Sequence, residues 1–177
     1  RYVHMLDYLV LYNSQSGNTK SVAAAIFSAL PEGSRDLIDI DSGKPIPEAS
    51  TYFIGFCVHR GSCCIEVSDL LSSLENKNIA LFGTCGMGRS AEYYSLIEKN
   101  VSAWINSSCR CLGCYICQGK MPMQVRQKYE NMRTSENAPQ VDGFIRNFDC
   151  AMTHPDREDL KKAQEFALSC ISHASCV

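Results

Sequence analysis

The chain has 177 residues, 45% of them hydrophobic, which is enough for one core but not for two domains of ordinary size. A formal charge of −2 and a sequence isoelectric point near 6.1 provide no basic surface, so nucleic acid is not an expected partner. No apolar run approaches the roughly 20 residues of a membrane-spanning helix, and residues 1–8 lack a signal-peptide core. We therefore expect one cytoplasmic domain over residues 1–177, with Met5 as a candidate natural start and residues 1–4 as an added remnant.

The chain contains 11 cysteines, an odd number that argues against the disulfide framework of an exported protein. Reduced thiols are therefore expected, and so many of them suggest a strongly reducing, anaerobic setting.

The first predicted strand, residues 8–12, runs into a short polar loop that is followed by a helix over residues 20–30. Hydroxyl and amide donors, a glycine for the turn and the unpaired N–H groups of the helix together predict a phosphate site. Its residues are Ser14, Gln15, Ser16, Gly17, Asn18 and Thr19. A nucleoside triphosphate loop would need a glycine directly before Lys20, where the chain has Thr19. The simpler alternative is an ordinary capped turn, since such turns prefer the same residues.

Four more strands are predicted at residues 35–40, 52–56, 79–83 and 110–117. Helices are predicted over residues 67–74, 91–105 and 156–173, the last capped by Asp156, and a short one over 121–133. Residues 41–47 should connect without a full helix, and residues 134–153 should be mostly loop because they are polar and contain Pro139 and Gly143. This alternation predicts an α/β fold with a parallel sheet covered by helices on both faces.

Loops that follow parallel strands meet at the carboxyl edge of the sheet, so two further loops should join the phosphate loop there. After the third strand come Cys57, Val58, His59, Arg60 and Gly61; after the fourth come Thr84, Cys85, Gly86, Met87, Gly88 and Arg89. The glycines of the latter loop allow its backbone to approach a flat ligand closely. The run from Gly86 to Ala91 also matches a dinucleotide fingerprint, but it follows the wrong strand, and the next strand ends without the acidic residue that a ribose needs.

The loop from Ser14 to Thr19, followed by these two loops, resembles the signature of the flavodoxin family. The resemblance implies a doubly wound five-stranded sheet of strand order 2-1-3-4-5, with FMN as cofactor. Its phosphate would lie in the first loop and its ring between the other two.

Flavodoxins usually carry a Trp or Tyr in the second loop, where this chain offers Val58, His59 and Arg60. A cation such as Arg60 near the ring would stabilise the anionic reduced flavin and raise its reduction potential. The alternative is that Arg60 and His59 simply face water, as loop side chains often do.

The resemblance also implies electron transfer to a redox partner protein, such as a reductase. Phe82 to Met87, Cys117 to Pro122 and His154-Pro155-Asp156 resemble a bacterial subgroup of flavodoxin-domain proteins. That subgroup includes the small flavodoxin found beside gut bacterial bilirubin reductase, which implies supply of electrons for reducing bilirubin to urobilinogen.

Three other interpretations remain open. Cys109, Cys111, Cys114 and Cys117, with Cys150, resemble part of an iron–sulfur ligand run, but strand alternation would place Cys114 on the opposite face from Cys111 and Cys117. The protein could instead be an FMN-dependent reductase of quinones, or a non-redox interaction module that has lost FMN. No catalytic residue and no metal site is predicted.

Overall fold

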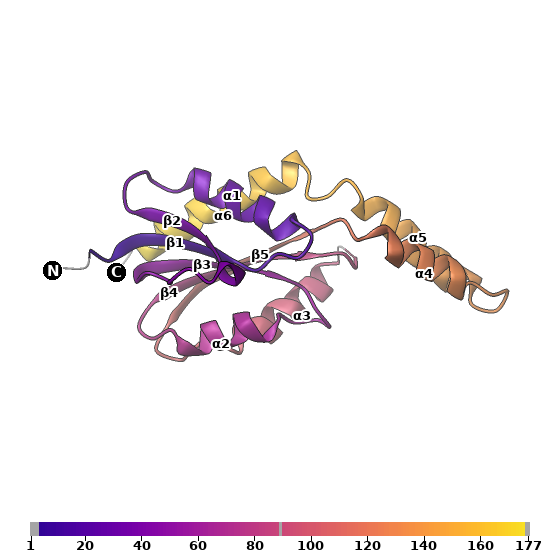
Figure 1. The fold of residues 1–177 in the computed structure, drawn as a ribbon, viewed down its shortest axis with the longest axis horizontal. Helices are drawn as coiled ribbons and strands as arrows, with labels where there is room; N and C mark the ends of the chain where they lie inside the picture. Colours follow the sequence, from indigo (N-terminus) through magenta and orange to yellow (C-terminus); the bar gives the residue numbers. More distant parts are fainter. Residues whose placement is uncertain (1–3, 89, 176–177) are drawn as a thin grey trace.

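The computed structural model describes residues 4–88 and 90–175, and within them five parallel strands form one sheet in the order β2-β1-β3-β4-β5 (Figure 1). This is the order that the flavodoxin resemblance implied. The strands are β1 Leu6–Tyr12, β2 Arg35–Asp39, β3 Ala49–Cys57, β4 Asn78–Cys85 and β5 Arg110–Gln118. A single 3-10 turn, Ile40–Ser42, follows β2, so the connection to β3 contains no full helix, as expected.

Helices cover both faces of the sheet (Figure 1). On one side lie α1 Asn18–Ala29 and α6 Arg157–Ala174; on the other lie α2 Ile65–Ser73 and α3 Ala91–Ser102. Asp156 caps α6 as predicted, because its side chain accepts a hydrogen bond from the Asp159 N–H and the Asp159 carboxylate accepts one in return. Within the described residues, no helix combines the length and apolarity needed to cross a membrane.

Two apolar clusters fill the space between the sheet and its helices. Phe53 and Phe82 belong to the cluster on the α1/α6 side, while Phe56 and Leu71 belong to the one on the α2/α3 side, and all four are fully buried. The central strands β1, β3 and β4 are therefore apolar on both faces, which is the pattern of a parallel sheet.

Two further helices, α4 Met123–Met132 and α5 Ala138–Ala151, form a helical arm that extends beyond the carboxyl ends of the strands (Figure 1). Helix α4 confirms the short helix expected there, but the loop predicted over residues 134–153 is wrong. Pro139 lies in the first turn of α5, where a backbone N–H has no hydrogen-bond partner within the helix, so proline is tolerated. The side chains of Val141 and Phe148 are buried.

Contacts between α4 and α5 hold the arm together. Arg133 pairs with Asp142 at 2.8 Å, and the rings of Tyr129 and Phe144 lie 5.4 Å apart between centroids. Such pairs of partner residues cannot be recognised from the polar composition of the segment.

We predict that Gly55→Ala destabilises the protein by about 1–3 kcal/mol, because the added methyl group would overlap the buried Phe82 ring. The control is Gly143→Ala in α5, where the nearest atom to an added Cβ is the flexible end of Arg146 at 3.8 Å. Alanine favours a helix, so this change should raise stability by up to about 1 kcal/mol. Urea unfolding measures both; equal effects of the two substitutions would contradict the packing described above.

Candidate functional site

A cavity of about 480 Å³ lies at the carboxyl edge of the sheet, where the three predicted loops meet. Its volume falls in the range of roughly 300–1,000 Å³ that is typical of cofactor sites. Eleven of the seventeen predicted site residues line it: Gln15, Ser16, Asn18, Cys57, Val58, Arg60, Gly61, Thr84, Cys85, Gly86 and Met87.

The phosphate loop presents the start of α1 without a side-chain cap. Gly17 precedes the helix with φ +88°, a conformation that favours glycine, and its N–H donates to the Ser14 hydroxyl at 3.1 Å. Ser14 therefore shapes the loop from within and does not line the cavity. The N–H groups of the first helical turn keep their capacity to bind an anion.

Thr19 and Asn18 fasten this loop to β4 and to the segment that follows β5. The Thr19 hydroxyl, 1% exposed, shares a hydrogen bond of 2.9 Å with the Thr84 hydroxyl at the end of β4. The Asn18 amide donates to the Lys120 carbonyl at 2.8 Å, after the end of β5. The Thr19 side chain thus positions the loop and is not among the groups that face the cavity.

A tight turn forms the second loop. His59 and Ser62 exchange two backbone hydrogen bonds, of 2.8 and 3.0 Å, with Arg60 and Gly61 at the tip. His59 and Arg60 are both exposed, but Arg60, which adopts φ +49°, lines the cavity and His59 does not. Of the three side chains offered in place of the usual aromatic, Val58 and Arg60 line the cavity and His59 does not.

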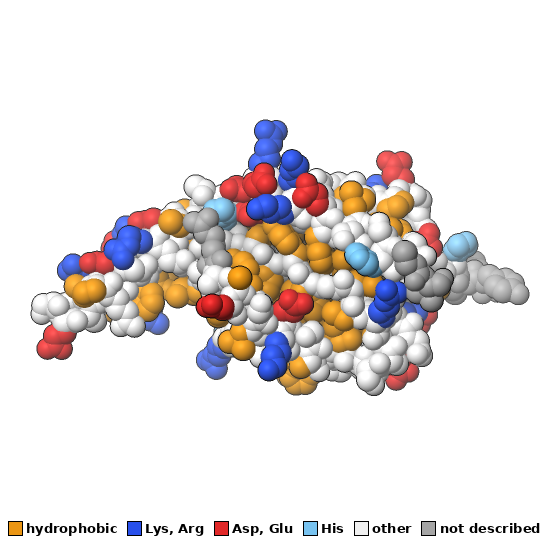
Figure 2. All heavy atoms as spheres, turned by 180° about the vertical axis from the view of Figure 1, so that it is seen from behind, with side chains coloured by type: hydrophobic (Ala, Val, Ile, Leu, Met, Phe, Trp, Pro, Cys, Tyr) orange, Lys and Arg blue, Asp and Glu red, His pale blue; other side chains and the backbone are white. Residues whose placement is uncertain are grey.

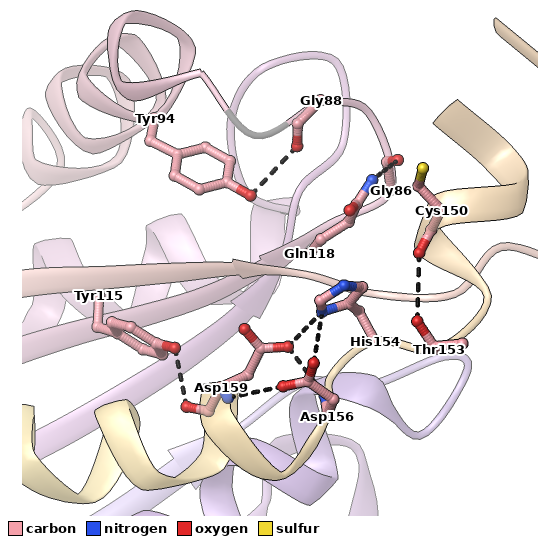
Figure 3. Close-up of polar contacts among 10 residues, drawn as sticks. All are labelled: Gly86, Gly88, Tyr94, Tyr115, Gln118, Cys150, Thr153, His154, Asp156 and Asp159. Carbon is pink, nitrogen blue, oxygen red and sulfur yellow. Dashed lines mark hydrogen bonds and ion pairs between the residues drawn. The ribbon is translucent and has the colours of Figure 1, made fainter. Parts of the chain in front are cut away.

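The third loop is held by the helical arm. The Asn147 amide of α5 donates to the Gly86 carbonyl at 2.9 Å and accepts from the Gly88 N–H at 3.0 Å. Tyr94 of α3 donates to the Gly88 carbonyl at 3.2 Å, and Gln118 of β5 lies against Gly86 (Figure 3). Gly88 is therefore held in place beside the cavity by hydrogen bonds and does not line it. The predicted site residue Arg89 lies outside the described residues.

Sequence reasoning missed five residues that line the cavity: Tyr93, Gly119, Lys120, Met121 and Pro122. Tyr93 supplies an aromatic ring from α3, whereas an aromatic was sought only in the loop after β3. The other four form a fourth loop, after β5. Glycine is required at 119, because an added Cβ would lie 2.5 Å from the Asn18 amide nitrogen.

The thiols in the cavity are held in their neutral form. Burial raises the pKa of the Cys57 thiol and of the Cys85 thiol, and Cys85 donates to the Met87 carbonyl at 3.2 Å. Neither thiol is therefore activated as a nucleophile.

The cysteines of β5 are separated by the sheet. Cys114 packs on the α2/α3 side and Cys117 on the α1/α6 side, where burial raises the Cys117 pKa to about 12. A register shift opposite Ile79 and Ala80 interrupts the strand alternation, and Cys111 lies exposed. Among residues 4–88 and 90–175, one group of three side chains lies close enough together to hold a metal ion, and it contains no cysteine.

A flavodoxin-domain family model matches residues 9–168, and the chain therefore belongs to the flavodoxin family. A protein named flavodoxin-like domain-containing protein BilS from Clostridioides difficile is 32% identical over 174 residues, covering 96% of this chain and 98% of its own length. A protein of the same name from Clostridium symbiosum is 29% identical over 189 residues, with the same coverage.

Solved structures share the fold. A flavodoxin from Streptococcus pneumoniae superposes with a TM-score of 0.57 at 11% identity, covering 94% of this chain and 98% of that one. Oxidised flavodoxin 2 from Bacillus cereus gives 0.55 at 16% identity, covering 94% and 99%.

FMN is the cofactor of this family, and the residues present fit it. The uncapped start of α1 suits a phosphate, and the apolar groups of Val58, Met87 and Tyr93 suit a flat ring. When bound, FMN supplies one- and two-electron chemistry. The chain would bind the phosphate, exclude water from the ring and set the surrounding charge.

We predict that FMN protects Cys57 and Cys85 from alkylation, because both line the cavity. Their raised pKa leaves less thiolate at any given pH, so both should also react more slowly than an ordinary thiol at pH 8. Exposed Cys111 and Cys150 serve as internal controls. Iodoacetamide labelling followed by peptide mass spectrometry measures all four; equal labelling of Cys57 with and without FMN would place the cofactor elsewhere.

Proposed function

We propose that this protein is a cytoplasmic FMN electron carrier that delivers electrons to a partner reductase. The observation that carries the proposal is the cavity where the phosphate loop and the two ring loops meet, in a chain of the flavodoxin family. The cavity is lined by small, apolar and amide groups, by the cations Arg60 and Lys120, and by thiols that are not activated, so the electron chemistry is left to the cofactor.

We further propose that the electrons serve the reduction of bilirubin to urobilinogen. The support is the sequence resemblance to the flavodoxin found beside bilirubin reductase, together with two relatives that carry the name BilS. In this role the carrier holds electrons, and the reductase binds and reduces the bilirubin.

The deciding experiment is anaerobic. The FMN-loaded protein is reduced with dithionite, freed of excess reductant and mixed with bilirubin, with and without a bacterial bilirubin reductase. We expect the bound flavin to be reoxidised, and urobilinogen separated by chromatography to form, only when the reductase is present.

Each other outcome has a defined meaning. Reoxidation by bilirubin alone, or reduction of the loaded protein by NADPH alone, would favour a self-sufficient FMN reductase. Failure of the folded protein to bind FMN would favour an interaction module and overturn the carrier function.

We also predict that Arg60→Gln lowers the reduction potential of bound FMN. Arg60 lines the cavity from the tip of its turn, and a cation stabilises the reduced, anionic form. A water-exposed charge about 4 Å away contributes about 1 kcal/mol, or about 40 mV for one electron. Arg60→Lys keeps the charge and should restore most of the potential. Dye-equilibrated redox titration measures all three proteins; an unchanged potential in Arg60→Gln would mean that Arg60 faces only water.

A further inference from the structure

A second cavity, of about 410 Å³, adjoins the first on the far side of the phosphate loop. The two cavities share Ser16, Asn18 and Lys120. The second one also reaches Gly17 and, across from the loop, His154. No carboxylate lines either cavity in the described part of the chain, so the region between them suits an anion.

Lys120 stands between the two cavities with its backbone fixed on both sides. Its N–H donates to the His154 carbonyl at 2.8 Å, and its carbonyl accepts from the Asn18 amide at 2.8 Å. The Lys120 ammonium group forms no ion pair with any other residue that the structure describes. The chain thus holds a free cation beside the phosphate loop.

His154 is oriented by the start of α6. Its Nδ1 lies 2.5 Å from a carboxylate oxygen of Asp159, and the same oxygen accepts the Asp156 N–H at 2.8 Å. A carboxylate only accepts, so Nδ1 carries the hydrogen. Figure 3 shows the other ring nitrogen turned away from both carboxylates. That nitrogen, Nε2, has no hydrogen-bond partner among residues 4–88 and 90–175.

We propose that Lys120 and His154 form a cationic wall for the phosphate monoester of FMN, opposite the phosphate loop. This inference rests on the FMN binding in the proposed function and adds two specificity residues to it. The Lys120 ammonium and, when the ring is protonated, the His154 Nε2–H donate charge-assisted hydrogen bonds to the phosphate. The uncapped N–H groups of α1 bind it from the other side.

The wall gives the site a means of selecting FMN over riboflavin. Riboflavin has the same ring and ribityl chain but no phosphate, so it gains nothing from Lys120 or His154. Loss of the wall should weaken FMN binding selectively, whereas damage to the fold should weaken both flavins.

The test compares Lys120→Gln and His154→Gln with the parent protein, by flavin fluorescence titration with FMN and with riboflavin. Each substitution should raise the FMN dissociation constant about tenfold or more, as expected for the loss of a charge-assisted hydrogen bond. The riboflavin constant should stay within about twofold. Inorganic phosphate should compete with FMN in the parent protein but not with riboflavin.

Lys128→Gln is the matched control, since it removes the same charge from the exposed surface of the arm without touching either cavity. Circular dichroism checks that each variant is folded; if His154→Gln is not, Lys120→Gln decides. FMN binding equal to the parent in a folded Lys120→Gln protein, or equal weakening of both flavins, overturns the inference and leaves the proposed function intact. A parent protein that binds neither flavin overturns both.

Discussion

Burial of the central strands on both faces is the constraint on which the site depends. Leu9, Phe53 and Leu81 are fully buried, so β1, β3 and β4 have no face on which a polar ligand could lie. Polar groups can gather only where these strands end, and in a parallel sheet the neighbouring strands end at the same edge. The apolar strands therefore determine the position of the cavity as much as the polar loops do.

Several polar groups in the loops use hydrogen bonds to position the site. The Thr19 hydroxyl is bound to Thr84, the Ser14 hydroxyl to the Gly17 N–H, and the Asn18 amide to Lys120. These bonds fix the path of the backbone, and the N–H groups at the start of α1 keep the capacity to bind an anion. The side chains of this hydroxyl-rich loop thus hold the main chain in place.

The sequence predicted those parts of the structure that depend on neighbours along the chain. Strand β1, the glycine turn at Gly17 and helix α1 are local features, and each was found where periodicity and turn chemistry placed it. Helix α5 was missed although Val141, Phe144 and Phe148 recur at helical spacing, because Pro139, Gly143 and the polar residues of the segment favoured a loop. Composition is a weak guide where the spacing of apolar residues contradicts it.

The loop after β5 was missed although the rule that brought the other loops to the carboxyl edge of the sheet applies to it as well. Asn18 and Lys120 lie 102 positions apart and meet at that edge. Tyr93 likewise reaches the cavity from α3, whereas the predicted site residues were all expected in loops. No pattern of spacing encodes such contacts; they follow from the strand order, which brings the end of β5 and the start of α3 to the edge where β1 ends.

The electrostatics of the site differ in sign from those of the whole chain. A net charge of −2, with acidic and basic side chains interspersed over the face drawn in Figure 2, gives no reason to expect an anion site. Yet the charged groups that line the cavities include Arg60 and Lys120, beside the positive end of α1, and the carboxylates of Asp156 and Asp159 are already bound to His154 or to backbone N–H groups. Screening limits the influence of distant charges to about 8–10 Å in physiological salt. The local arrangement, and not the total charge, therefore determines what the cavity attracts.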